Sequence, residues 1–160
     1  MRTLVVYYSL TGMTRTVAGM IATSLSADLE EIACSDYKPG FLGYLMAAFD
    51  AWRGHRPAIA PLRYAPENYD LVIVGGPMWA GHIATPVAAY LAALSGRLRN
   101  VAFFLTHGGA PPEKVFLEMK SLSGALPRAV VSLREAEVRK GAHAMRASLF
   151  VDALLADQPV

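Results

Sequence analysis

Hydroxyl side chains cluster near the start of the chain, directly after a short apolar run. Gly12 is surrounded by the hydroxyl residues Ser9, Thr11, Thr14 and Thr16, and a helical pattern begins directly behind them. The free N–H groups and the dipole at a helix N-terminus favour anions, and short hydroxyls donate hydrogen bonds to phosphate oxygens. A Ser or Thr helix cap is the structural alternative. Because a cap needs fewer hydroxyls, the segment predicts a phosphate site.

Two glycine-containing segments follow later apolar runs. Residues 75–82 read Gly-Gly-Pro-Met-Trp-Ala-Gly-His, and residues 106–109 read Thr-His-Gly-Gly. Glycine lets a planar ligand approach the backbone, and Trp79 offers an aromatic face on which a ring could stack. Trp79 alone would read as a packing residue, but its place between two glycine-containing turns favours a ligand contact. The pair Gly108-Gly109 alone is only a turn signal, with polar neighbours suited to a ligand edge.

Other site chemistries are poorly supported. The chain has neither the Gly-x-x-x-x-Gly-Lys-Ser/Thr loop of ATP-binding proteins nor the Gly-x-Gly-x-x-Gly of dinucleotide folds. No two histidines share the i, i+3 or i, i+4 spacing of metal ligands, so no metal is expected. Cys34 lacks the arginine of a Cys-x5-Arg phosphatase loop and reads as a small apolar residue. His82 and His107 are candidate proton or charge donors, whereas His55 and His143 read as surface residues.

Short apolar runs alternate with helical patterns along the chain. The runs are typical of buried strands and lie at 4–8, 71–74 and 101–105, with weaker signals at 129–133 and, as an edge strand, at 27–32. Helical spacing occurs at 17–25, 87–94 and 115–122, and Met145, Leu149 and Ala153 indicate a final helix. Thr85 and Pro86 read as an N-cap and first helical position. This alternation predicts an α/β fold with a parallel sheet and a ligand at the carboxyl ends of its strands.

Length and composition favour one domain, residues 1–160, and exclude several classes. The chain has 160 residues, of which 54% are apolar, and a formal net charge of +2. It has no basic block, so no nucleic acid is expected, and no apolar run approaches the ~18 residues of a membrane span. A single cysteine and an N-terminus too short for a secretory signal favour a cytoplasmic location.

The segment between Pro39 and Pro57 is unusually apolar for a helix. Phe41, Leu45, Phe49 and Trp52 recur at helical spacing, and the polar face is thin. We expect a crossover helix that packs on the sheet. A helix that is apolar most of the way round also needs a second partner. That partner is either another subunit, giving a homodimer through residues 41–52, or the open side of a bound ring.

The three ligand segments together resemble the flavodoxin family. Their motifs are S-x-T-G-x-T after the first strand, G-x-P-x-W-x-G after the third and T-x-G-G after the fourth. The resemblance covers nearly the whole chain. It implies a flavodoxin-like doubly wound three-layer sandwich, with a five-stranded parallel sheet in the order 2-1-3-4-5, and FMN as the cofactor.

By that resemblance, the first loop holds the FMN phosphate and the other two embrace the flavin ring. The phosphate residues are Ser9, Thr11, Gly12, Met13 and Thr14. One side of the flavin is lined by Pro77, Met78, Trp79, Ala80 and Gly81, and the other by Thr106, His107, Gly108 and Gly109. The chain departs from the family in its slightly basic charge and in having His107-Gly108-Gly109 where an aromatic residue is usual.

Three functions follow from the resemblance and stay open. The first is an electron carrier that cycles FMN between oxidation states and exchanges electrons with a redox partner protein or a small-molecule acceptor. The second is an NAD(P)H-dependent FMN oxidoreductase of the quinone reductase type. The third is an interaction domain that has lost the cofactor. Because the same fold hosts all three, the residues favour a flavin protein but barely separate the first two.

Overall fold

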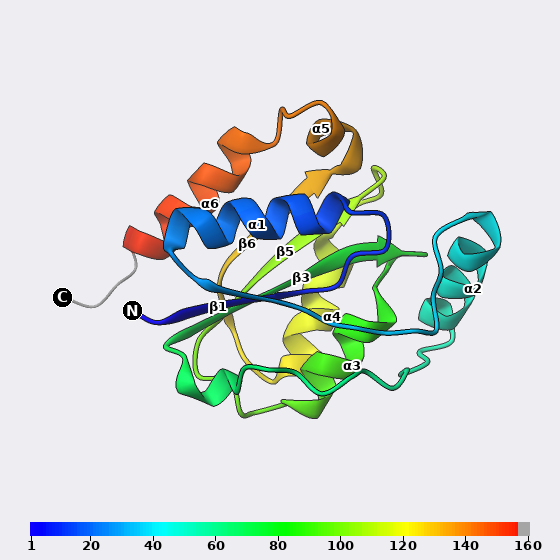
Figure 1. The fold of residues 1–160 in the computed structure, drawn as a ribbon, viewed down its shortest axis with the longest axis horizontal. Coiled ribbons are helices and arrows are strands. Elements are labelled where there is room, and N and C mark those ends of the chain that lie inside the picture. The colour runs from blue at the N-terminus through cyan, green and yellow to red at the C-terminus, as the bar shows by residue number, and fades with distance from the viewer. Residues whose placement is uncertain (157–160) are drawn as a thin grey trace.

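The computed structural model describes residues 1–156, and the last four residues of the predicted domain lie outside that range. Within it, five strands form a parallel sheet in the order β2-β1-β3-β5-β6 (Figure 1). These are β1 (Thr3–Tyr7), β2 (Asp28–Glu31), β3 (Leu71–Trp79), β5 (Val101–His107) and β6 (Pro127–Arg134). The short β4 (His82–Ile83) pairs antiparallel with the end of β3. The predicted doubly wound fold and its 2-1-3-4-5 strand order are confirmed.

Helices cover both faces of the sheet. One face carries α1 (Met13–Leu25), α5 (Glu135–Arg139) and α6 (Ala144–Ala156), and the other α3 (Thr85–Ala93) and α4 (Glu113–Ser123) (Figure 1). Alternate residues of β1 face the two layers: Leu4 and Val6 join the α3–α4 core, whereas Val5 and Tyr7 join the α1–α6 core. A sheet buried on both faces explains its continuous apolar strands. No helix within residues 1–156 is long and apolar enough to cross a membrane.

The third strand is longer than its apolar run predicted. Residues 75–79, expected to be a loop, continue β3, and Gly75 to Pro77 pair with β5 at Phe104 to Thr106. The two glycines also make room for packing. A Cβ atom on Gly75 would lie 2.2 Å from the Phe104 ring, and one on Gly76 would lie 2.6 Å from Val87. The turn comes only at Ala80-Gly81, where both φ angles are positive, and leads into β4. Gly75 and Gly76 are therefore strand residues that make room for packing, and not part of the expected loop.

Helix α2 (Phe41–Trp52) forms where it was predicted but does not cover the sheet. It lies beyond the carboxyl ends of the strands, at the side of the molecule (Figure 1). Only Ala47 and Ala51 of this helix are buried, and its large apolar side chains are exposed: Phe41, Leu42, Tyr44, Leu45, Met46, Phe49 and Trp52. The expected packing on the sheet is corrected. A homodimer through residues 41–52 stays a prediction.

Three local expectations also differ from the structure. Helix α6 buries its other face: Met145, Leu149 and Ala153 are exposed, and the core is reached by Ala147, Phe150, Val151 and Leu154. Ala84, not Thr85, is the N-cap of α3. His143, expected at the surface, is buried. For α6, apolar spacing alone could not choose among neighbouring positions.

Candidate ligand-binding site

The loop between β1 and α1 presents backbone amides at a helix N-terminus. Gly12 takes a left-handed conformation with φ of 96°, and the first intrahelical bond runs from Thr16 N to Gly12 O, at 3.1 Å. The Ser9 hydroxyl oxygen accepts hydrogen bonds from Gly12 N and Arg15 N, at 3.0 and 3.3 Å. The intervening amides of Met13 and Thr14 come too early in the helix for an intrahelical acceptor. They are therefore available to an anion.

The hydroxyl groups of this loop differ in whether they can donate a hydrogen bond to a ligand. The Thr14 hydroxyl lies 2.7 Å from that of Thr106 and ties the loop to β5. The Thr16 hydroxyl donates to Gly12 O at 3.2 Å. Ser9 Oγ accepts two N–H groups, which leaves its own hydrogen for a ligand. Thr11 is exposed and has no hydrogen-bond partner within residues 1–156, so Ser9 and Thr11 are the free hydroxyl donors.

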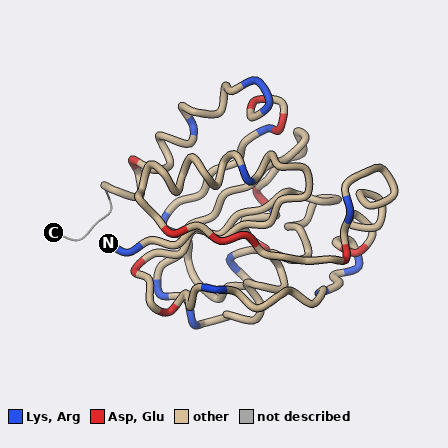
Figure 2. The backbone as a smooth tube through the Cα atoms, in the orientation of Figure 1, with Lys and Arg blue, Asp and Glu red and all other residues tan. Residues whose placement is uncertain are grey.

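The charges beside this loop are already paired. The guanidinium of Arg15 lies 2.7 Å from the Glu31 carboxylate, which also accepts a hydrogen bond from the Tyr7 hydroxyl at 3.0 Å. Glu31 belongs to the acidic edge strand β2, the red segment at the centre of Figure 2. Residues 9–14 contain no acidic side chain. An anion at the amides of α1 would therefore meet no carboxylate on the loop itself.

A cavity of about 220 Å³ joins the three predicted ligand segments. Predicted residues on its wall are Thr11, Thr14, Pro77, Met78, Trp79 and Gly108. The wall also includes Leu10, Tyr44 of α2 and Glu135 of α5, which the sequence motifs did not indicate. Tyr44 could have been suggested by the unpartnered apolar helix, whereas nothing marked Glu135. The cavity thus lies at the carboxyl ends of the strands, as doubly wound sheets predict.

The other predicted site residues lie around this cavity and not on its wall. Ser9 lines a second hollow, described below, and Gly12 and Met13 shape the start of α1. Ala80 and Gly81 line a separate depression with His82 and Glu118, whose Nδ1 and Oε1 atoms are 3.5 Å apart. Thr106 and His107 are the buried last residues of β5, which was predicted to end at Leu105. Gly109 follows them in an exposed turn.

Trp79 is a core residue in this structure. Its side chain is only 2% exposed and meets the rings of Tyr8 and Tyr37 edge to face, with centroids 5.6 and 5.1 Å apart. These contacts fix the indole at the floor of the site, where it borders the cavity. Direct stacking of Trp79 on a ligand ring stays a prediction.

His107 does not act as a positive charge at neutral pH. Its side chain is buried, and its Nδ1 atom accepts a hydrogen bond from Gly109 N at 3.1 Å. Burial, together with the nearby Arg134 guanidinium, lowers the pKa of His107 below its usual 6.5. Of the two roles open to His107, charge donor or turn residue, this geometry favours the second, in which the neutral ring holds the 107–109 turn.

The lowered pKa of His107 predicts a pH-dependent loss of stability. Because the unfolded chain takes up this proton first as pH falls, the contribution is complete above pH ~6.5 and decreases below it, toward the folded-state pKa. NMR titration should give His107 a pKa below 6.5. The variant His107→Asn, whose amide oxygen can still accept from Gly109, should lose less stability than wild type between pH 7 and 5. Titration of His107 at or above 6.5 would contradict this account.

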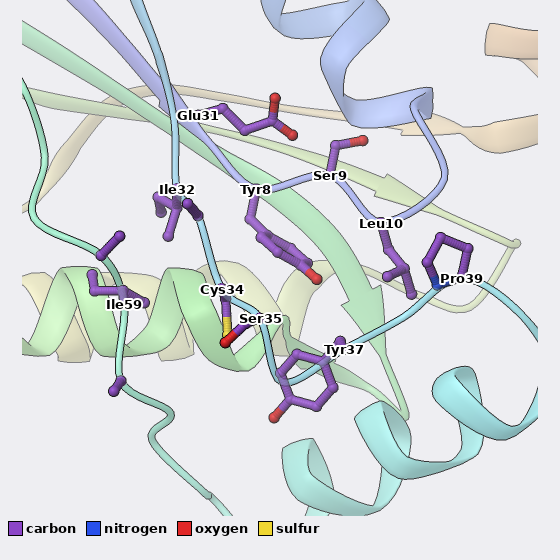
Figure 3. A pocket seen from close by; sticks show the side chains of 13 residues that line it. Tyr8, Ser9, Leu10, Glu31, Ile32, Cys34, Ser35, Tyr37, Pro39 and Ile59 are labelled. Carbon is purple, nitrogen blue, oxygen red and sulfur yellow. The ribbon is translucent and has the colours of Figure 1, made fainter.

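A larger hollow of about 770 Å³ lies beside the first cavity, at the ends of β1 and β2 (Figure 3). Leu10 borders both spaces. Tyr8, Cys34 and Tyr37 line the hollow, and sequence motifs did not join them because Tyr8 follows β1 whereas Cys34 and Tyr37 follow β2.

Comparisons with known proteins agree with this geometry. A flavodoxin family model matches residues 2–135. The crystal structure of a flavoprotein in complex with FMN from Lactobacillus acidophilus NCFM is 27% identical, with a TM-score of 0.72, and 87% of this chain and 97% of that chain are covered. The apo-form of the flavoprotein from the same organism, also 27% identical, has a TM-score of 0.65 over 87% of this chain and 95% of that one.

A more distant structure shows the shared fold alone. Oxidised Flavodoxin 2 from Bacillus cereus is 20% identical, with a TM-score of 0.61 and coverage of 99% and 100% of the two chains. No curated protein in the comparison matches the chain. With a family model that spans most of its length and a parallel sheet in the family's strand order, the chain belongs to the flavodoxin family.

Proposed function

We propose that this protein binds FMN at the carboxyl ends of β1, β3 and β5 and transfers electrons through it. The observation that carries the proposal is the N-terminus of α1, where the Met13 and Thr14 amides and the Ser9 and Thr11 hydroxyls are available to one anion. Such a set of donors is suited to a phosphate group. The FMN-bound relative from Lactobacillus acidophilus supports the same choice of ligand.

The remaining walls suit the flavin ring. Apolar and aromatic surface lies next to the phosphate donors and is provided by Leu10, Pro77, Met78 and Tyr44. At Gly108 no side chain covers the backbone, and a Cβ atom there would have no neighbour within 4 Å. Because about 220 Å³ is less than the 300–1,000 Å³ usual for ligand pockets, part of the ligand would remain outside the cavity. Glu135 on the wall would repel a phosphate, so the phosphate belongs at the α1 end.

The protein's part in the reaction is to position the cofactor. Bound FMN supplies one- and two-electron redox chemistry. The amides of α1 would hold the phosphate, the Thr14–Thr106 bond keeps that loop against β5, and Leu10 and Tyr44 would line the ligand's apolar side. His107, neutral and held by Gly109, contributes shape and no charge.

An electron carrier is the first candidate for the activity. Its partner would be a redox protein or a small-molecule acceptor that approaches the exposed turns at Ala80-Gly81 and Gly108-Gly109. The second candidate is an NAD(P)H-dependent quinone reductase. The hollow of about 770 Å³ next to the site favours it, because an enzyme needs space for a second small molecule.

Rapid mixing of FMN-loaded protein with NADPH and with NADH separates these activities. A carrier should keep its yellow colour for many seconds with either nucleotide and be reduced only when a reductase is added. A reductase should bleach quickly with one nucleotide and recover its colour when a quinone is added. Protein that takes up no FMN would contradict both candidates and favour an interaction domain.

A further inference from the structure

The hollow at the ends of β1 and β2 has the features of a second binding site. Its walls are mainly apolar and come from the segments that follow β1 and β2 and those on either side of α2: Leu10, Ile32, Ala33, Pro39, Ala58 and Ile59. Figure 3 shows the lining side chains around one space, with Tyr8 at its side and Tyr37 between the hollow and α2. A volume of about 770 Å³ lies within the range of small-molecule pockets.

Tyr8 brings an unpaired hydroxyl into this hollow. Its side chain is only 4% exposed, and its oxygen has no hydrogen-bond partner within residues 1–156. By contrast, the Tyr37 hydroxyl donates to Asp50 Oδ2 at 3.0 Å and accepts from Thr85 Oγ1 at 2.8 Å. The fully buried unpaired side-chain atoms of residues 1–156 are the Tyr90 hydroxyl oxygen and His143 Nδ1, so the Tyr8 oxygen stays accessible from the hollow. In this fold the Tyr8 hydroxyl can be paired by a molecule in the hollow.

The charges around the hollow favour a neutral ligand. Glu31 is the only ionised side chain among the lining residues, and Arg15 and the Tyr7 hydroxyl already hold its carboxylate. Burial raises the pKa values of Tyr8 and Cys34, so both keep their hydrogens at neutral pH. The Tyr8 hydroxyl therefore keeps a hydrogen that no group within residues 1–156 accepts, and a carbonyl oxygen is a complementary acceptor for it.

We propose that the hollow binds a neutral, mostly apolar carbonyl compound, with quinones as the representative class, whose carbonyl oxygen accepts a hydrogen bond from the Tyr8 hydroxyl. The binding itself does not need FMN. The further interpretation, that a quinone in the hollow accepts electrons from FMN, rests on the proposed function. Leu10 would then separate the two ligands, because it borders both spaces.

A titration with tetramethyl-1,4-benzoquinone, followed by amide NMR, tests the proposal. This quinone is fully substituted and cannot add the Cys34 thiol at a ring carbon. Its addition should shift the amide signals of residues 33–35 and 58–60, which line or adjoin the hollow. The variant Tyr8→Phe should bind about threefold to tenfold more weakly, the usual effect of one neutral hydrogen bond.

Tyr90→Phe is the matched control. Its hydroxyl also has no partner within residues 1–156, but it is fully buried and Tyr90 does not line the hollow. This variant should bind the quinone as wild type does. Equal affinity of wild type and Tyr8→Phe, or no shift with the quinone at millimolar concentration, would overturn the proposal.

Parallel titrations of FMN-free and FMN-loaded protein separate this proposal from the proposed function. Both forms should bind the quinone with similar affinity. Loss of quinone binding on FMN loading would overturn the proposal by showing that the flavin itself fills the hollow. If the protein takes up no FMN, the proposed function fails, but the FMN-free titration still decides whether the hollow binds a quinone.

Discussion

Riboflavin should bind this protein at least a hundredfold more weakly than FMN. The two ligands differ only in the phosphate, for which the Met13 and Thr14 amides and the Ser9 and Thr11 hydroxyls are available. Hydrogen bonds to a charged group contribute about 1.5–3 kcal/mol each, so losing two of them costs about 3–6 kcal/mol. Calorimetric titration of the FMN-free protein with each ligand measures the difference directly.

Two variants show whether the loss arises at the first loop. Thr11→Ala should weaken FMN binding about tenfold and leave riboflavin binding unchanged, because the Thr11 hydroxyl is exposed and has no partner within residues 1–156. Thr23→Ala is the control: its hydroxyl donates to Gly19 O on the surface of α1, away from the site. Similar affinities for FMN and riboflavin in the wild-type protein would remove the phosphate site from the account.

Gly75→Ala should destabilise the fold by about 3 kcal/mol, the upper part of the usual range for an overpacked core. The new Cβ atom would lie 2.2 Å from the Phe104 ring, which is completely buried between β5 and the α1–α6 layer. For a chain of this size the melting temperature should fall by roughly 6–12 °C. Thermal unfolding followed by circular dichroism gives this value.

Gly108→Ala is the matched control for this substitution. A Cβ atom there would meet nothing within 4 Å, so stability should change by no more than ~0.5 kcal/mol. Adding Phe104→Leu to Gly75→Ala should recover part of the loss, because the two side chains compete for one space. If Gly75→Ala and Gly108→Ala melt at the same temperature, glycine at position 75 is not required by packing.

The arrangement of strands and helices was predictable because local patterns encode it. The apolar runs at 4–8 and 101–105 have no polar face and therefore indicate strands buried on both sides. Helical spacing between them then requires right-handed crossovers and a parallel sheet. The same rule places the ligand segments together at the carboxyl ends, where the structure has Thr11, Pro77 and Gly108 on one cavity wall.

The details that were missed depend on contacts between distant residues. Gly75 and Gly76 read as a turn, but they are strand residues whose missing side chains make room for Phe104 and Val87. His107 reads as a charged loop residue, but burial in β5 and the nearby Arg134 keep it neutral. Phe104, Val87 and Arg134 each lie more than ten residues from the position that they affect, so no local pattern could identify these roles. Tyr44 reached the cavity wall only because α2 stands beyond the sheet and does not cover it.

The central claim is that the N-terminus of α1 holds the phosphate of FMN. Amide NMR of the protein titrated in parallel with FMN and with riboflavin tests it most directly. FMN should produce large shifts of the Met13 and Thr14 amide signals, because a hydrogen bond to a phosphate oxygen changes the environment of each N–H group. Riboflavin should shift signals near Met78 and Gly108 but leave those two amides close to their positions in the free protein. Unchanged Met13 and Thr14 signals at saturating FMN would contradict the account.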